Sequence, residues 1–297
     1  KGLFHRAVVM SGSFGIRNMQ EKARRFTELF LAELGVTPAD VHRLRFMPYA
    51  ALRSAGEAVF ARENRPFEGF FDLGIATENF SYAPVVDGAV LPDAALAPAL
   101  SAGVPMIIGT TLNEFVTGIN RPAFESMSEE ELAAQVEKAF PGRRKAIVGA
   151  FRARTPDAKP CDLWSRIATA PIRAAAINQA ASKAALNKAA AYLYWFSWRT
   201  PVFDGRPRAF HCADIPFVFN NTDRCENMTG GGDGARALSA LMADAIVAFA
   251  RTGDPNHNGL PGWTPFSAQS APTLIFDDAT RLALDPDGEE LASIAGA

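Results

Sequence analysis

The sequence has 297 residues, enough to bury a sizeable hydrophobic core. Hydrophobic residues make up 48% and charged residues 21%, and the formal net charge is −2, so nothing in the composition favours nucleic acid or an anionic membrane as partner. No run of 18 apolar residues occurs, and the sequence therefore predicts no transmembrane helix.

The first hundred residues predict one strand, two helices and a long loop. The consecutive apolar run at residues 7–10 is typical of a strand that is covered on both faces, as in a parallel sheet. Apolar residues among charges at 19–34, followed by a glycine, predict an amphipathic helix. A second, short helix is expected after Pro48. Residues 70–100 are rich in Pro, Gly and Asp and predict mostly loop, with an extended piece at 82–86.

The middle of the chain predicts two more strands and two more helices. Residues 104–109 form another compact apolar run, and the aromatic residues 191–198 are strand-like. Ser128 followed by three glutamates is the signature of a capping box, with a helix to about Phe140. The alanine-rich residues 166–189 predict a long helix, with Pro171 near its start or at a kink.

Residues 233–252 predict a last strong helix that ends before Gly253, and short strands are expected at 273–276 and 282–284. Strands separated by helices indicate an α/β fold with a mainly parallel central sheet flanked by helices. No internal repeat and no linker is apparent, so residues 1–297 are expected to form one partial domain without an internal boundary.

Two side chains are candidates for chemistry because functional groups gather beyond the carboxyl ends of strands in open α/β sheets. Glu114 lies five residues after Gly109, where a carboxylate could orient a histidine. From position alone, a solvated loop glutamate is the simpler interpretation. His211 lies in the loop after the aromatic strand, and a lone histidine in an apolar setting is more often structural than catalytic.

The other motifs do not indicate a metal or cofactor site. The three cysteines are too sparse for a disulfide scaffold; free thiols are favoured over a bridge between Cys212 and Cys225. A zinc site at His211, Cys212 and Cys225 lacks paired spacing and a fourth ligand. Residues 254–265 begin like a calcium loop but end in Pro265 instead of glutamate, which indicates a turn. No metal and no cofactor is therefore expected.

A serine nucleophile is missing from the printed residues. No G-x-S-x-G occurs, and the G-S-x-G at residues 12–15 lacks the glycine two places before its serine. Nevertheless, five blocks occur in the order found in one enzyme family: KGLFHRAVVMSGS (1–13), SYAPVVDGAVLP (81–92), VPMIIGTTLNEF (104–115), AFHCADIPFVF (209–219) and ARTGDPNHNGLPGWTPF (250–266).

In these blocks the chain resembles the type-B carboxylesterases, the cholinesterase-like branch of the α/β-hydrolases. The resemblance implies a Ser-Glu-His triad for the hydrolysis of carboxylic esters, with Glu114 as acid and His211 as base. It places the serine elbow about fifteen residues before Lys1, so the chain is expected to be the C-terminal portion of such an enzyme and to be inactive alone. Phe80 resembles an acyl-pocket aromatic, with a plain core role as the alternative. Phe115 stands where many members carry glycine.

The implied partner is a small-molecule ester, with no nucleic acid and no membrane. A sheet cut before residues 7–10 would present an apolar edge, which we expect to be covered by the missing N-terminal half or by self-association. Localisation is open, with a bacterial cytoplasm slightly favoured. The alternatives in function are a non-catalytic binding module of the same fold and an inactive truncated fragment.

Overall fold

The computed structural model describes residues 2–13, 18–65, 78–91, 98–119 and 121–296. Contacts between residues group the chain into two compact units, one made of Lys1–Phe14 with Pro98–Ala297 and the other of Gly15–Ala97. This grouping does not test the prediction that the chain forms one domain without an internal boundary, which stays a prediction. No helix in the described ranges is both long enough and apolar enough to cross a membrane.

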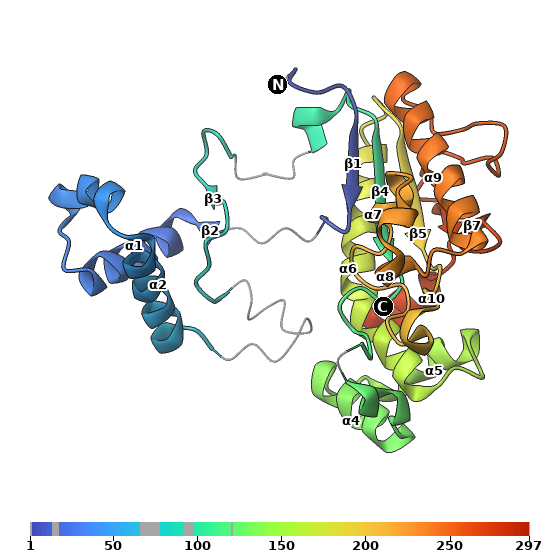
Figure 1. Ribbon diagram of the computed structural model, residues 1–297, viewed down its shortest axis with the longest axis horizontal. Helices are drawn as coiled ribbons and strands as arrows, with labels where there is room; N and C mark the ends of the chain where they lie inside the picture. The colour runs from blue at the N-terminus through green and yellow to red at the C-terminus, as the bar shows by residue number, and fades with distance from the viewer. Residues whose placement is uncertain (1, 14–17, 66–77, 92–97, 120, 297) are drawn as a thin grey trace. The chain divides into compact units, whose positions relative to one another are not determined.

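The larger unit is built on a five-stranded sheet in the order β1-β4-β5-β6-β7 (Figure 1). Its strands are β1 (Ala7–Met10), β4 (Met106–Thr111), β5 (Ala191–Phe196), β6 (Pro272–Phe276) and β7 (Arg281–Leu284). The pairs from β1 to β6 are parallel, and β7 runs antiparallel to β6. This arrangement confirms the mainly parallel sheet.

The central strands are buried on both faces, whereas β1 is not. All six residues of β5 are buried, and so are all but the first of β4. In β1 the side chain of Val8 is 37% exposed. The expectation that this strand is covered on both faces is therefore wrong for the described chain, because β1 lies at the edge of the described sheet and pairs only with β4.

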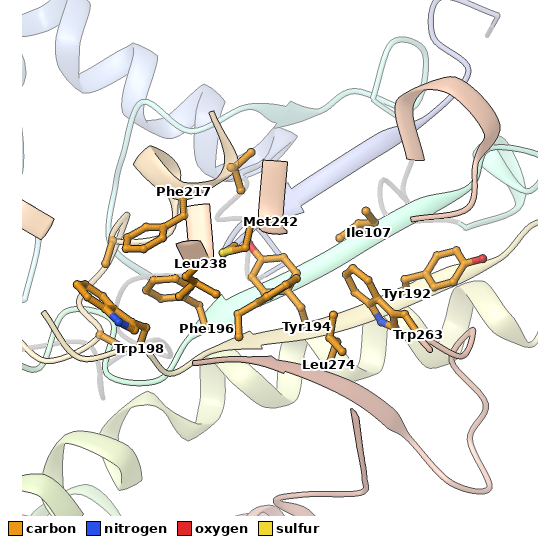
Figure 2. Close-up of a cluster of buried hydrophobic side chains, with 14 of the residues drawn as sticks. Ile107, Tyr192, Tyr194, Phe196, Trp198, Phe217, Leu238, Met242, Trp263 and Leu274 are labelled. Atoms are coloured by element: carbon orange, nitrogen blue, oxygen red, sulfur yellow. The ribbon is translucent and has the colours of Figure 1, made fainter. Parts of the chain in front are cut away.

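Two helices cover the two faces of the sheet. Because side chains alternate along a strand, Ile108 and Leu193 pack on one face with Ala176 and Ala180 of α6 (Pro160–Ala184). The other face carries Ile107, Tyr192, Tyr194 and Phe196, which cluster with Leu238, Met242 and Phe249 of α9 (Asp233–Thr252) and with Trp263 (Figure 2). Burial of each such large side chain contributes about 1.5–3 kcal/mol.

A glycine is needed where this second cluster meets β4. Gly109 pairs with Tyr194 in the parallel register. A Cβ atom at residue 109 would lie 2.0 Å from a carbon of the Tyr194 ring. The phenol therefore occupies the space that any other residue at 109 would fill.

The remaining helices of the larger unit include both expected and unexpected ones. Helix α4 (Glu129–Ala139) has the predicted capping box, in which the Ser128 hydroxyl accepts from the Glu131 amide at 3.1 Å and the Glu131 carboxylate accepts from the Ser128 amide at 2.8 Å. Helix α9 ends at Gly253 with φ of 87°, as predicted. The elements that were not foreseen are α5 (Arg144–Arg154), α7 (Ile215–Val218), α8 (Glu226–Thr229), α10 (Gly288–Ala295) and the 3-10 helices η3 (Pro98–Ser101), η4 (Pro122–Ser126), η5 (Val202–Gly205) and η6 (Thr222–Arg224).

Helix α6 begins six residues earlier than predicted, with Pro160 in its first turn and Pro171 in its interior. Proline is well suited to the first turn, since the amide it lacks has no helical partner there. The true start signal is thus Pro160, and Pro171 marks neither the start nor the end of the helix.

The smaller unit contains α1 (Gln20–Glu33), η1 (Pro38–Phe46), α2 (Tyr49–Glu63) and the short parallel pair β2 (Asn18–Met19) and β3 (Val85–Val86). The predicted first helix is confirmed, and the helix after Pro48 is longer than expected, at 15 residues. The ring of Phe26 contacts Phe60, Phe80 and Tyr82 at 5.4–5.7 Å between centroids. Much of the expected loop at 70–100 lies outside the described residues.

Candidate active site

Glu114 is buried in the loop that follows β4, with 1% of its surface exposed. One carboxylate oxygen, Oε1, accepts from the Thr111 amide at 2.8 Å and from the Ser11 hydroxyl at 2.6 Å. The alternative of a solvated loop glutamate is therefore wrong. The residue has a positive φ of 41°, a backbone conformation that is uncommon for residues other than glycine, asparagine and aspartate.

His211 lies against the other carboxylate oxygen. Its Nδ1 atom is 2.5 Å from Glu114 Oε2. The main chains also meet, because Glu114 forms a parallel bridge with Phe210 and the His211 amide donates to the Glu114 carbonyl at 2.8 Å. The imidazole is 31% exposed, and no described residue forms a hydrogen bond with Nε2. A histidine held in this way through Nδ1 presents Nε2 for proton transfer.

The loop before His211 is anchored by a buried guanidinium. Arg208 is 2% exposed and donates to both oxygens of Glu125 at 2.7 and 2.9 Å and to Asp162 at 2.5 Å. Asn113 adds a second anchor, since its side-chain oxygen accepts from the Ala209 amide at 3.2 Å and its main-chain N–H donates to the Ala209 carbonyl at 3.0 Å. These contacts fix the chain immediately on the N-terminal side of the histidine.

Phe115 covers one face of the imidazole. Its ring stacks on His211 with 3.9 Å between centroids and 28° between planes. The glycine found here in many members of the family that the sequence resembles would leave this face of the histidine open, so the departure at residue 115 shapes the surroundings of His211.

A second buried acid lies behind the histidine. Asp214 is 1% exposed and accepts from the Tyr194 hydroxyl at 2.6 Å. Burial is the main cause that raises the pKa of Asp214 to about 6, and the nearby Glu114 adds to it. The pKa of Tyr194 is raised well above its ordinary value for the same two reasons, burial and a neighbouring carboxylate.

The remaining candidate residues have the following surroundings. The ring of Phe80, in the smaller unit, packs on Phe26, and its role in substrate binding stays a prediction. Cys161, Cys212 and Cys225 are free thiols. The Asp254 carboxylate accepts from the amide and the side chain of Asn256, as expected for a turn. In the described ranges no three His, Cys, Asp or Glu side chains are grouped so as to hold a metal ion.

The contact between Ser11 and Glu114 was not predicted from the sequence. This hydrogen bond joins residues 103 positions apart. The strand order could have indicated this contact, because β1 and β4 are parallel neighbours and their carboxyl ends lie at the same edge of the sheet.

Comparison with known proteins identifies the family of the chain. The model of the "Carboxylesterase family" matches residues 1–292. The chain belongs to the carboxylesterase family. It is 27% identical over 302 residues to the para-nitrobenzyl esterase of Bacillus subtilis and 27% identical over 304 residues to the phenmedipham hydrolase of Pseudarthrobacter oxydans, covering 98% of this chain and 56% of each relative.

Solved structures show the same likeness. A carboxylesterase of Geobacillus stearothermophilus superposes on this carboxylesterase chain with a TM-score of 0.72 at 29% identity, over 99% of this chain and 59% of the other. An esterase from Clostridium hathewayi, described as hydrolysing aliphatic aromatic polyesters, gives 0.69 at 26% identity, over 100% and 57%. The central sheet is thus that of the α/β-hydrolase carboxylesterases, and the chain spans a little over half the length of these relatives.

Proposed function

We propose that this chain is part of a serine carboxylesterase and supplies the acid, Glu114, and the base, His211, of a Ser-Glu-His triad. The serine and the oxyanion hole would come from residues that precede Lys1 in the intact protein. The observation that carries the proposal is the contact of 2.5 Å between His211 Nδ1 and the buried Glu114 carboxylate. Membership of the carboxylesterase family supports the reaction class.

The chemistry follows from the two nitrogens of the imidazole. With Nδ1 bound to Glu114, Nε2 takes the proton of the attacking serine and later returns it to the departing alcohol. The buried carboxylate keeps the imidazole in the required tautomer and stabilises the imidazolium that forms. The substrate is a small carboxylic ester, which passes through an acyl-enzyme and leaves as an acid and an alcohol.

Ser11 does not fit the role of nucleophile. Its hydroxyl donates to Glu114 Oε1, on the carboxylate oxygen that does not contact the histidine. It therefore supports the acid, since together with the Thr111 amide it holds the carboxylate in its orientation. No G-x-S-x-G occurs among the 297 residues to supply a different serine on an elbow.

The test measures p-nitrophenyl acetate hydrolysis by two proteins. One is the 297-residue chain, and the other is the longer gene product that also contains the residues before Lys1. We expect turnover only from the longer protein, and a loss of about 10⁶-fold in kcat with His211→Ala. His42→Ala, an exposed histidine of the smaller unit, is the matched control and should leave kcat unchanged. Retention of more than a tenth of the activity in His211→Ala, or a preceding segment without a serine elbow, would overturn the proposal.

A further inference from the structure

A cavity of about 320 Å³ lies at the carboxyl ends of β5 and β6, beside α5 and α6. Neither Glu114 nor His211 lines it. Its apolar part is formed by Leu112, Trp195 and Ile275. Its volume is at the lower end of the range of small-molecule sites, and an apolar lining with a few convergent polar groups is typical of them.

Five arginines line the same cavity, and two of them are fully paired. Arg208 is held by Glu125 and Asp162. Arg166, whose side chain is 10% exposed, donates to Glu290 and to the Thr155 hydroxyl. These two arginines belong to the framework of the cavity, and their charges are balanced by the acids that they contact.

The other three arginines form a cationic rim, which we define as Arg154, Arg199 and Arg281. The nearest carboxylate oxygen of Glu290 is 3.9 Å from Arg154, and that of Asp162 is 3.6 Å from Arg199. Both side chains are about half exposed, at 44% and 49%. Arg281, at the start of β7, forms no ion pair within the described part of the chain.

The two acids of the lining, Asp162 and Asp277, are outnumbered by its five arginines. Asp162 is already engaged by Arg208 at 2.5 Å. The Asp277 carboxylate accepts from the Ser197 hydroxyl at 2.6 Å and from the Asp278 amide at 2.9 Å. A cavity with an apolar floor and more arginines than acids in its lining attracts an anion that also carries an apolar body.

We propose that this cavity is a second ligand site, which binds an amphipathic carboxylate: the apolar body lies on Leu112, Trp195 and Ile275, and the carboxylate contacts the cationic rim. Arginine suits this ligand because its planar guanidinium presents paired donors to a carboxylate. A bare inorganic anion would leave the apolar floor uncovered. A neutral ester would bring no negative charge to the rim.

The test is a titration of the 15N-labelled chain with 2-naphthoate, followed by NMR. The sequence has four tryptophans, and Trp195 is the one that lines the cavity, so its indole N–H signal, assigned with Trp195→Phe, reports on this site alone. We expect a saturable shift of this signal. The neutral analogue 2-naphthalenemethanol should bind at least about tenfold more weakly, because it lacks the charge that the rim attracts.

Variants separate the rim from general surface charge. Arg199→Gln and Arg281→Gln should each weaken 2-naphthoate binding by about three- to tenfold, and raising the salt concentration should weaken it further. The matched control is Arg224→Gln, an exposed arginine outside the cavity, which should change affinity less than about twofold.

A shift that does not saturate, equal affinity for the neutral analogue, or unchanged affinity in the Arg199→Gln/Arg281→Gln double variant would overturn the proposal. Since the readout is binding and the variants leave Glu114 and His211 intact, failure of the proposed esterase function would not alter this result.

Discussion

At Ser11 one hydroxyl group meets the buried carboxylate of Glu114 from the side opposite the histidine. A hydrogen bond to a buried charged group contributes about 1.5–3 kcal/mol. Ser11→Ala in the intact enzyme should therefore lower kcat by about tenfold or more, with little change in KM, because the residue acts through Glu114 and not on the substrate.

The control is Ser13→Ala, since Ser13 has the same 6% exposure but donates to Gln179. It should keep nearly full activity. A complete loss of turnover in Ser11→Ala, equal to that of His211→Ala, would instead identify Ser11 as the nucleophile.

Asp214 makes stability depend on pH in an unusual direction. Its pKa is raised by burial from 3.8 to about 6, so the folded chain binds this proton more tightly than the unfolded chain does. The contribution of Asp214 to stability is therefore full below about pH 4 and is lost as the pH rises through 6, a change of about 3 kcal/mol over the whole window.

Denaturant unfolding of wild type and Asp214→Asn at pH 4.5 and 7.5 measures this effect. The free energy of unfolding of wild type minus that of the variant should fall by about 2 kcal/mol between the two pH values. An equal pH dependence in both proteins would show that the Asp214 carboxyl is charged throughout. The Asn side chain still accepts from Tyr194, so the variant keeps that hydrogen bond.

Among the elements, the loop that carries His211 depends on Arg208 for its attachment to η4 and α6. Removal of one partner of a buried ion pair costs about 3–5 kcal/mol; Glu125 and Asp162 are 21% and 23% exposed, which favours the lower end. Arg208→Gln should lower the free energy of unfolding by about 3 kcal/mol, as measured by urea denaturation.

The neighbouring Arg206→Gln is the control. Among the described residues the Arg206 side chain donates to the Phe203 carbonyl and lies over the Phe203 ring, on an exposed turn, so its loss should cost less than about 1 kcal/mol. Equal effects of the two substitutions would mean that the Arg208 ion pairs do not anchor the loop.

For the molecule as a whole, strand β1 is the weak point. Of the described strands only β4 pairs with it, and Leu3, Phe4 and Val8 near it are 89%, 56% and 37% exposed. Unpaired, apolar edges of this kind invite pairing with another chain. We expect the isolated chain to self-associate, or to bind a complementary N-terminal half of the enzyme.

Light scattering after size-exclusion chromatography measures this association. Val8→Lys places a charge on the edge and should shift the chain towards monomer, whereas Val247→Lys, on α9 and 45% exposed against 37% for Val8, should not. A stable, monodisperse monomer of the unmodified chain would contradict the expectation.

How far the sequence predicts the fold depends on how clear the start and end signals of each helix or strand are. Helix α9 carries both an amphipathic pattern and a terminal glycine, and its bounds are predicted to the residue. Helix α5 follows Arg143, which gives no side-chain cap, and α10 is only eight residues long, so neither has a start signal that stands out from the surrounding loop.

The residues of the candidate site also differ in how far the sequence predicts them. Glu114 and His211 are found because they stand in blocks that resemble a family, not because their local sequence is distinctive. Ser11, Asp214 and Arg208 act through contacts with residues far away in the chain or buried around them, and such contacts are set by strand order and by tertiary packing. The departure at Phe115 is visible in the sequence, whereas its stacking on the imidazole is not.

The bridge between Glu114 and Phe210 gives the two catalytic candidates a shared backbone, with the His211 amide bound to the Glu114 carbonyl. Displacement of one loop therefore carries the other along, and the main chain itself helps to hold the spacing of carboxylate and imidazole. Under the proposed function, residues around the substrate can therefore change, by natural variation or by design, while the carboxylate and the imidazole keep their geometry for proton transfer.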